Sequence, residues 1–149
     1  MTCVMLVHVT AVVIDGKAVL LRGPPGAGKS DLALRLIDGG AALIADDQAE
    51  LRRSGSHIFV TAPASIAGLI EIRGVGILRL EVVEEAALAM CVDLLPSTEI
   101  ERLPERRFEA VLGAAIPLIA VSAFEASAAA KVRLALRAVS VDPLAAILQ

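Results

Sequence analysis

The feature of the sequence that most restricts the fold is the stretch GPPGAGKS at residues 23–30. It matches the pattern G-x-x-x-x-G-K-[ST], in which glycines let backbone N–H groups turn toward bound phosphates. The pattern carries this meaning between a strand and a helix, and both are predicted here. We therefore expect an α/β domain with a nucleotide-binding loop formed by Gly23, Pro24, Pro25, Gly26, Ala27, Gly28, Lys29 and Ser30.

The segments around this loop are predicted to form a hairpin, a helix and a further strand. Residues 7–14 and 18–23 are largely apolar runs joined by Asp15-Gly16, a pair that tolerates the positive φ of a tight hairpin turn. Residues 30–38 have apolar side chains at helical spacing, and two glycines follow as a helix stop. Residues 41–45 are wholly apolar, which is typical of a strand covered on both faces.

The rest of the chain alternates between strand and helix signals. Residues 49–62 predict a second hairpin, which Pro63 ends, and residues 77–83 and 87–95 are strand candidates. Residues 127–139 are rich in strong helix formers and predict a closing helix. We expect one domain over residues 1–149, with a mixed, partly antiparallel sheet around the loop.

The composition is apolar but contains no membrane-spanning run. Hydrophobic residues make up 56% of the chain, and its uncharged stretches, 1–14 and 111–124, are shorter than the roughly 18 residues that a spanning helix needs. The amino terminus lacks the basic region of a signal peptide, so we expect a cytoplasmic protein. The apolar excess is better placed in subunit contacts, which predicts a homo-oligomer.

The charge pattern and the cysteines argue against two other classes of protein. The net charge is −3 without clustered Lys and Arg, and Trp and Tyr are absent, so nucleic acid is not an expected partner. Cys3 and Cys91 lie far apart, and neither has a second Cys or His at metal-ligand spacing. We expect two buried free thiols and no zinc site.

Two carboxylates, Asp46 and Asp47, follow the apolar strand 41–45. Side chains alternate along a strand, so the two should point to opposite sides unless the backbone bends. A carboxylate here can hold Mg²⁺ or take a proton from an attacking hydroxyl. The alternative is a polar strand end that begins a turn.

A third unusual segment contains charged residues beside glycines. Glu71 and Arg73 lie on one face of a short extended stretch, and Gly74 and Gly76 follow. The segment indicates a functional site, whereas the alternative is an ion pair on a strand edge followed by a glycine bulge.

The remaining candidates are isolated histidines and an arginine cluster. His8, in an apolar strand, and His57 are each more typical of a core or edge residue than of a catalyst. Arg102, Arg106 and Arg107 are most simply a solvated face, from which one arginine could reach phosphates.

Taken in order, these pieces resemble the catalytic domain of the bacterial HPr kinase/phosphorylase. The resemblance rests on His8, the loop end Gly28-Lys29-Ser30, ALRLIDGGAALIADD at 33–47, EIRGVGI at 71–77, ERL at 101–103 and Ile116-Pro117. It implies ATP- or pyrophosphate-dependent phosphorylation of a serine on the phosphocarrier HPr, and removal of that phosphate by phosphorolysis with inorganic phosphate. It also implies a fold like that of phosphoenolpyruvate carboxykinase and a hexamer.

The resemblance assigns roles to individual residues. Lys29 matches the P-loop lysine, Ser30 the Mg²⁺-binding serine, and Asp47 the proton acceptor of phosphorylation and proton donor of the reverse step. Asp46 is its neighbour in the site, and His8 matches an active-site histidine.

Further roles fall on the second half of the resemblance. Glu71 matches a second Mg²⁺ ligand, and Arg102 is the candidate catalytic arginine. The family signature corresponds to Ile70, Glu71, Ile72, Arg73, Gly74, Val75 and Gly76, and continues to Arg79.

The chain departs from the family pattern at both ends of the resemblance. Only seven residues precede His8, so we expect the amino-terminal domain of longer members to be absent, and LIAVSAFEAS at 118–127 replaces a basic PGRN-like segment. Two other functions stay open from the residues alone. They are a P-loop kinase of a small metabolite and a non-catalytic nucleotide-binding regulatory module.

Overall fold

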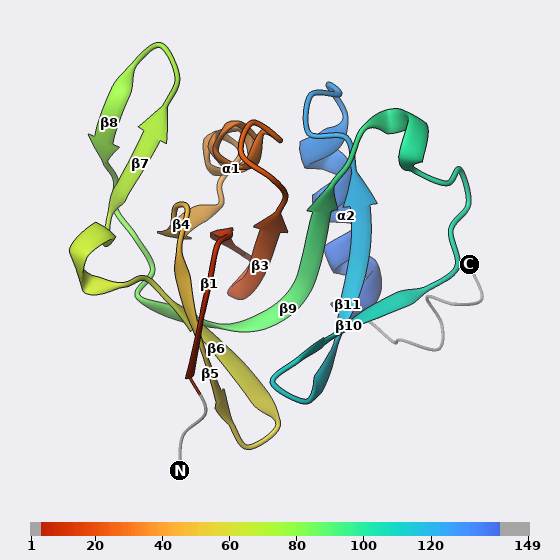
Figure 1. Cartoon of the computed structure of the whole chain (residues 1–149), viewed down its shortest axis with the longest axis horizontal. Coiled ribbons are helices and arrows are strands. Elements are labelled where there is room, and N and C mark those ends of the chain that lie inside the picture. Colours follow the sequence, from red (N-terminus) through yellow and green to blue (C-terminus); the bar gives the residue numbers. More distant parts are fainter. Residues whose placement is uncertain (1–3, 141–149) are drawn as a thin grey trace.

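The computed structural model describes residues 4–140 of the chain (Figure 1). Within this range the chain forms a nine-stranded sheet, a separate two-stranded sheet and two α-helices. The strands of the large sheet are β1 Val4–Val7, β2 Thr10–Ile14, β3 Lys17–Arg22, β4 Ala42–Ala45, β5 Ala49–Ser54, β6 His57–Thr61, β9 Glu85–Leu94, β10 Arg107–Val111 and β11 Ala114–Val121. The other elements are α1 Lys29–Asp38, η1 Ala64–Ile66, β7 Leu69–Ile72, β8 Gly76–Arg79, η2 Ser97–Glu99 and α2 Ala128–Ser140.

The large sheet mixes parallel and antiparallel pairs, as predicted. Its strand order is β1-β5-β6-β9-β3-β2-β4, with β11 also paired to β9 and β10 paired to β11. β3 and β11 run parallel to β9, whereas the other pairs are antiparallel. The carboxyl ends of these three parallel strands therefore lie at one edge of the sheet (Figure 1). In open α/β sheets this is the edge where ligands bind.

The hairpin that precedes the glycine-rich loop is confirmed. Asp15 and Gly16 join β2 to β3 with φ values of 51° and 77°. Two consecutive left-handed residues are the geometry of the two-residue hairpin turns that suit the twist of a sheet.

The strand predicted over residues 7–14 is wrong in one respect, because the structure divides it in two. β1 ends at Val7 and pairs with β5, whereas β2 begins at Thr10 and pairs with β3 and β4. His8 lies exposed in the break between them, so its prediction as a residue within a strand is also wrong. An apolar run does not reveal where a chain changes partner, because both pieces have the same pattern.

Side chains of the sheet alternate between two apolar clusters. In β3, Val19 and Leu21 belong to the cluster that contains Leu36 of α1 and Val132 of α2. Leu20, between them, belongs to the cluster on the opposite face, with side chains of β5 and β6. Both faces of β3 are therefore buried, which explains its continuous apolar run.

The signature segment forms a hairpin of its own. β7 and β8 pair only with each other, from Leu69 opposite Arg79 to Ile72 opposite Gly76, and the hairpin projects from the large sheet beside α1 (Figure 1). The strand predicted over 77–83 is therefore shorter than expected. Beyond Arg79, Val82 makes an isolated bridge with Leu43.

No helix in residues 4–140 is long and apolar enough to cross a membrane. The predicted buried free thiol at Cys91 is confirmed, and Cys3 lies outside the described residues.

Burial of Cys91 predicts a pH dependence of stability. Burial raises the pKa of this thiol from its ordinary 9.0 to about 11, although nearby Arg22 opposes the shift. The thiol therefore stabilises the folded state fully below pH 9, and this contribution is lost as pH rises to 11, because the unfolded thiol ionises first. We expect a loss of about 2–3 kcal/mol in the free energy of unfolding over this interval.

The measurement is urea denaturation of the native chain and of Cys91→Ala at pH 8, 9, 10 and 11. The alanine variant carries every other titrating group, so the difference between the two curves isolates Cys91. Curves that stay parallel from pH 9 to 11 would contradict the prediction.

Candidate active site

The glycine-rich loop lies between the end of β3 and the start of α1, as predicted. Gly28 has a φ of 97°, and a Cβ atom on it would lie 2.8 Å from Ala123 Cβ, so both conformation and space require glycine there. Lys29 begins α1, and its Nζ donates hydrogen bonds to Gly23 O at 2.7 Å and Pro24 O at 3.3 Å. The lysine thus lies over its own loop, at a helix amino terminus that favours anions.

Two ion pairs fix the strand end directly before this loop. Arg22 Nε donates to Asp93 Oδ1 at 2.8 Å, and its Nη2 donates to Glu109 Oε2 at 2.8 Å. Burial alone lowers the pKa of Arg22, but the hydrogen bonds to Asp93 and Glu109 outweigh burial and raise this pKa above its usual value. The charged guanidinium therefore joins β3, β9 and β10 at the edge that holds the loop.

A cavity of about 980 Å³ opens above the loop and brings together most of the predicted site residues. The loop and α1 contribute one wall, Asp47 contributes a carboxylate, and the β7–β8 hairpin contributes the facing wall. The lining residues are Pro25, Gly26, Gly28, Lys29, Ser30, Asp31, Leu34, Asp47, Glu71, Ile72, Arg73, Gly74, Val75, Gly76, Ile77 and Phe124.

Asp46 is not among these lining residues and is only 8% exposed. Its Oδ1 accepts hydrogen bonds from Ser30 Oγ at 2.7 Å and Thr10 Oγ1 at 2.9 Å. Its Oδ2 accepts one from the backbone N–H of Glu71 at 3.1 Å. One buried carboxylate therefore connects the phosphate loop, β2 and the signature hairpin.

Asp47 has different surroundings from its neighbour, because β4 ends at Ala45 and the backbone bends at Asp47 instead of continuing the strand alternation. It is exposed in the cavity, and its φ of 71° ends the extended conformation of β4. A left-handed non-glycine residue is uncommon, costs on the order of 1–3 kcal/mol, and is found preferentially at functional sites. The backbone bend thus places one carboxylate inside the protein and the next in the cavity.

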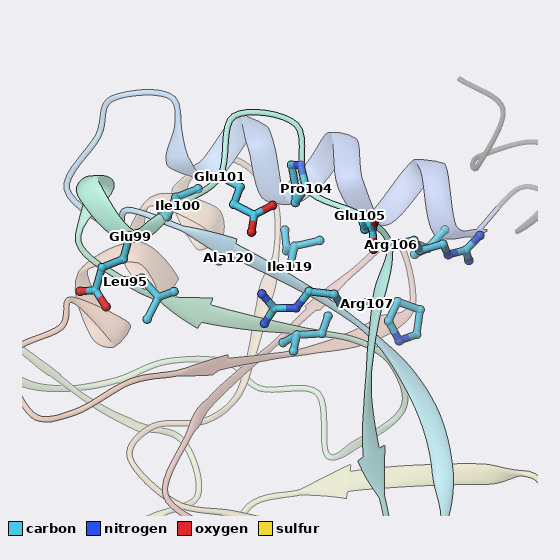
Figure 2. Close-up of a pocket in the computed structure, with 13 residues that line it drawn as sticks. Leu95, Glu99, Ile100, Glu101, Pro104, Glu105, Arg106, Arg107, Ile119 and Ala120 are labelled. Atoms are coloured by element: carbon cyan, nitrogen blue, oxygen red, sulfur yellow. The ribbon is translucent and has the colours of Figure 1, made fainter.

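His8 and Arg102 do not line this cavity. Arg102 is exposed in the segment that follows η2, and its neighbours along the chain border a different cavity of about 230 Å³. Figure 2 shows Glu101, Pro104 and Arg107 around that second cavity, which β11 and α2 also line. The two cavities have no lining residue in common.

Two residues of the site, Thr10 and Phe124, were not among the predicted ones. Thr10 is buried and bonds Asp46, and its only signal is a hydroxyl within an apolar strand. Phe124 lines the cavity from the loop between β11 and α2. Its signal is compositional, because the chain has three Phe and neither Trp nor Tyr.

The donor set at the cavity fits a hard divalent cation. Ser30, Asp47 and Glu71 offer a hydroxyl and two carboxylates, and Mg²⁺ prefers oxygen ligands. Among residues 4–140 there is no cluster of three or more His, Cys, Asp or Glu that could hold a metal by itself. The arrangement therefore fits Mg²⁺ bound by few protein ligands together with substrate phosphates, as is usual for this ion.

Two curated relatives are similar to parts of the chain. The HPr kinase/phosphorylase of Exiguobacterium sibiricum is 47% identical over 72 residues, which are 48% of this chain and 23% of the relative. The HPr kinase/phosphorylase of Caldanaerobacter subterraneus subsp. tengcongensis is 37% identical over 111 residues, which are 72% of this chain and 36% of the relative. The match therefore spans about a quarter to a third of the length of these relatives.

The fold has a solved counterpart. The structure described as the HPr(Ser) kinase/phosphatase from Coxiella burnetii matches with a TM-score of 0.80 and 26% sequence identity, over 89% of this chain and 94% of that chain. The family model for the HPr serine kinase C-terminal domain matches residues 1–133. Since that match covers most of the 149-residue chain, the chain belongs to the HPr serine kinase C-terminal domain family.

Proposed function

We propose that this domain transfers the γ-phosphoryl group of ATP to a serine of an HPr-type phosphocarrier protein, and that inorganic phosphate reverses the transfer. The observation that carries the proposal is that the phosphate loop, Asp47 and Glu71 line one cavity. Family membership supports the substrate, because the relatives are named for HPr.

In the forward direction the serine Oγ attacks the γ-phosphorus, and the bond from that phosphorus to the β–γ bridging oxygen breaks. The hydroxyl proton passes to a carboxylate oxygen of Asp47, and ADP leaves. A serine hydroxyl is a weak nucleophile, so a positioned base contributes directly to the rate. Lys29 and the loop amides stabilise the negative charge on the transferring group.

In the reverse direction an oxygen of inorganic phosphate attacks the phosphorus of phosphoserine. The bond from phosphorus to the serine oxygen breaks, Asp47 returns its proton to that oxygen, and pyrophosphate is the second product. The same carboxyl group thus accepts the serine proton in phosphorylation and donates a proton to the serine oxygen in phosphorolysis.

The residues proposed to hold Mg²⁺ are Ser30 and Glu71. The ion, when bound, supplies charge neutralisation on the phosphate oxygens. Asp46 is proposed as a positioning residue, because its Oδ1 fixes the Ser30 hydroxyl and its Oδ2 fixes the backbone of Glu71.

We also propose that His8 is an active-site histidine, that Arg102 is the catalytic arginine, and that the protein is cytoplasmic and self-associates. Support for a homo-oligomer comes from exposed apolar side chains: on the edge strand β1, Val4 is 59% and Leu6 is 54% exposed, and Phe108 on β10 is 51% exposed. Such surface is typical of subunit contacts. Sedimentation would give the number of subunits, for which the family resemblance implies six.

The test incubates the chain with HPr, Mg²⁺ and ATP labelled on the γ-phosphate, then adds unlabelled phosphate. We expect label on HPr serine in the first step and labelled pyrophosphate in the second. HPr with its acceptor serine replaced by alanine is the control. Transfer to a small metabolite but not to HPr, or tight ATP binding without any transfer, would contradict the proposal.

A further inference from the structure

Phe124 is an aromatic side chain that lines the cavity and is largely exposed to solvent. It is 69% exposed, although exposed large apolar rings are unfavourable in water. The other two Phe rings each have an arginine guanidinium carbon 5.1 Å from the ring centroid, Arg52 over Phe59 and Arg106 over Phe108. Among residues 4–140 no such contact covers Phe124, so its ring face is available to a ligand.

The Phe124 ring lies directly beside the phosphate loop. Its Cζ and Cε1 atoms would be 3.0 and 3.1 Å from a Cβ atom on Gly28. The ring therefore packs against the Gly28 backbone, one residue before Lys29.

The loop that carries Phe124 is fixed to the helix that begins with Lys29. Arg35 of α1 donates hydrogen bonds to the backbone carbonyls of Ala123 and Glu125, the two neighbours of Phe124, and the bond to Glu125 O measures 3.1 Å. The position of the ring relative to the phosphate loop is therefore set by tertiary contacts.

The topology places the loop that carries this ring at the same edge of the sheet as the phosphate loop. The phosphate loop follows β3 and the Phe124 loop follows β11, and both strands run parallel to β9 (Figure 1). Both loops thus lie at the carboxyl edge of the sheet, and both line one cavity. That cavity has space for a nucleoside as well as for its phosphates.

We propose that Phe124 is the platform on which the base of the bound nucleoside triphosphate stacks. The proposal rests on the proposed function, because it places the triphosphate on the loop at Lys29. An aromatic ring binds a base through its π-face, which every base offers, so the platform favours nucleotides over base-free phosphates. The domain therefore takes a nucleoside triphosphate in preference to pyrophosphate or tripolyphosphate as its phosphoryl donor.

The chain allows a direct spectroscopic test, because it has no Trp or Tyr. Phe124→Trp introduces a single fluorophore, and Phe108→Trp is a matched control at an exposed Phe that does not line the cavity. Each variant is titrated with ATP and with tripolyphosphate in the presence of Mg²⁺. We expect ATP, and not tripolyphosphate, to quench Phe124→Trp, while Phe108→Trp responds to neither.

A second measurement compares affinities for the same two ligands by calorimetry. Phe124→Ala is expected to weaken ATP binding roughly 5- to 150-fold and to leave tripolyphosphate binding unchanged. Phe124→Leu, which keeps apolar bulk without a ring face, should also lose ATP affinity. Both variants should fold, because the side chain is mostly exposed.

Equal losses for ATP and tripolyphosphate would show that Phe124 acts only by supporting the phosphate loop, and unchanged ATP affinity would show that the base lies elsewhere. Either result overturns the inference and leaves the proposed function standing. A native chain that binds neither ATP nor tripolyphosphate would overturn the proposed function, and the inference with it.

Discussion

Replacement of Lys29 with alanine is expected to lower phosphoryl transfer by at least about 100-fold in both directions. The ammonium group is the cation of the phosphate loop, and phosphoryl transfer depends mainly on positioning and electrostatics. Lys29 Nζ contacts the carbonyls of Gly23 and Pro24, so its charge is already centred on the loop before an anion binds. In the proposed mechanism the same anion site holds ATP in one direction and the pyrophosphate product in the other, so both directions should fail together.

The measurement is the initial rate of HPr phosphorylation and of phosphoserine phosphorolysis, each at saturating substrate. Lys17→Ala is the matched control, because Lys17 begins β3 at the end opposite the loop. That variant should retain both rates. A Lys29→Ala enzyme that retains either direction would contradict the assigned role.

The parts of the fold that were predicted correctly depend on local sequence. Asp15-Gly16 determines a turn by itself, and the glycines, Lys29 and Ser30 form a loop whose pattern is continuous in sequence. α1 follows at once with clear apolar periodicity, and β4 follows it as a wholly apolar run. Two residues that line the cavity, Asp47 and Glu71, were predictable for the same reason, because each belongs to a short motif.

The parts that were missed depend on which strands become neighbours. β1 and β2 have the same apolar pattern but different partners, so the break at His8 leaves no local signal. The hydrogen bond from Thr10 to Asp46 joins residues 36 positions apart. The path of residues 95–107, which places Arg102 beside another cavity, is likewise determined by tertiary packing.

The contrast between Asp46 and Asp47 also shows what a motif cannot specify. In the sequence ADD, the motif alone makes the two adjacent carboxylates equally good candidates for the general base. The structure distinguishes them by burial: three hydrogen bonds occupy Asp46, whereas the carboxylate of Asp47 faces the cavity. Substitutions at the two positions should therefore fail in different ways.

Replacement of Asp47 with asparagine is expected to leave ATP affinity and stability nearly unchanged while it lowers transfer by about 10²- to 10⁴-fold, the range for loss of a general base. Asparagine is the informative substitution because it tolerates the left-handed φ of 71° at this position, which alanine does not. Its amide has the shape of the carboxylate but cannot accept the serine proton or return it.

Asp46→Asn is the matched control, and it should fail by a different route. Its amide nitrogen cannot accept the hydrogen bonds that Ser30, Thr10 and the Glu71 N–H now donate, so at least one buried donor loses its partner. The cost is about 1–3 kcal/mol of stability. Thermal unfolding, ATP affinity by calorimetry and the two transfer rates, measured on both variants, separate these outcomes. An Asp47→Asn variant with undiminished turnover would show that another group takes the serine proton, because the amide leaves this position no basic oxygen at neutral pH.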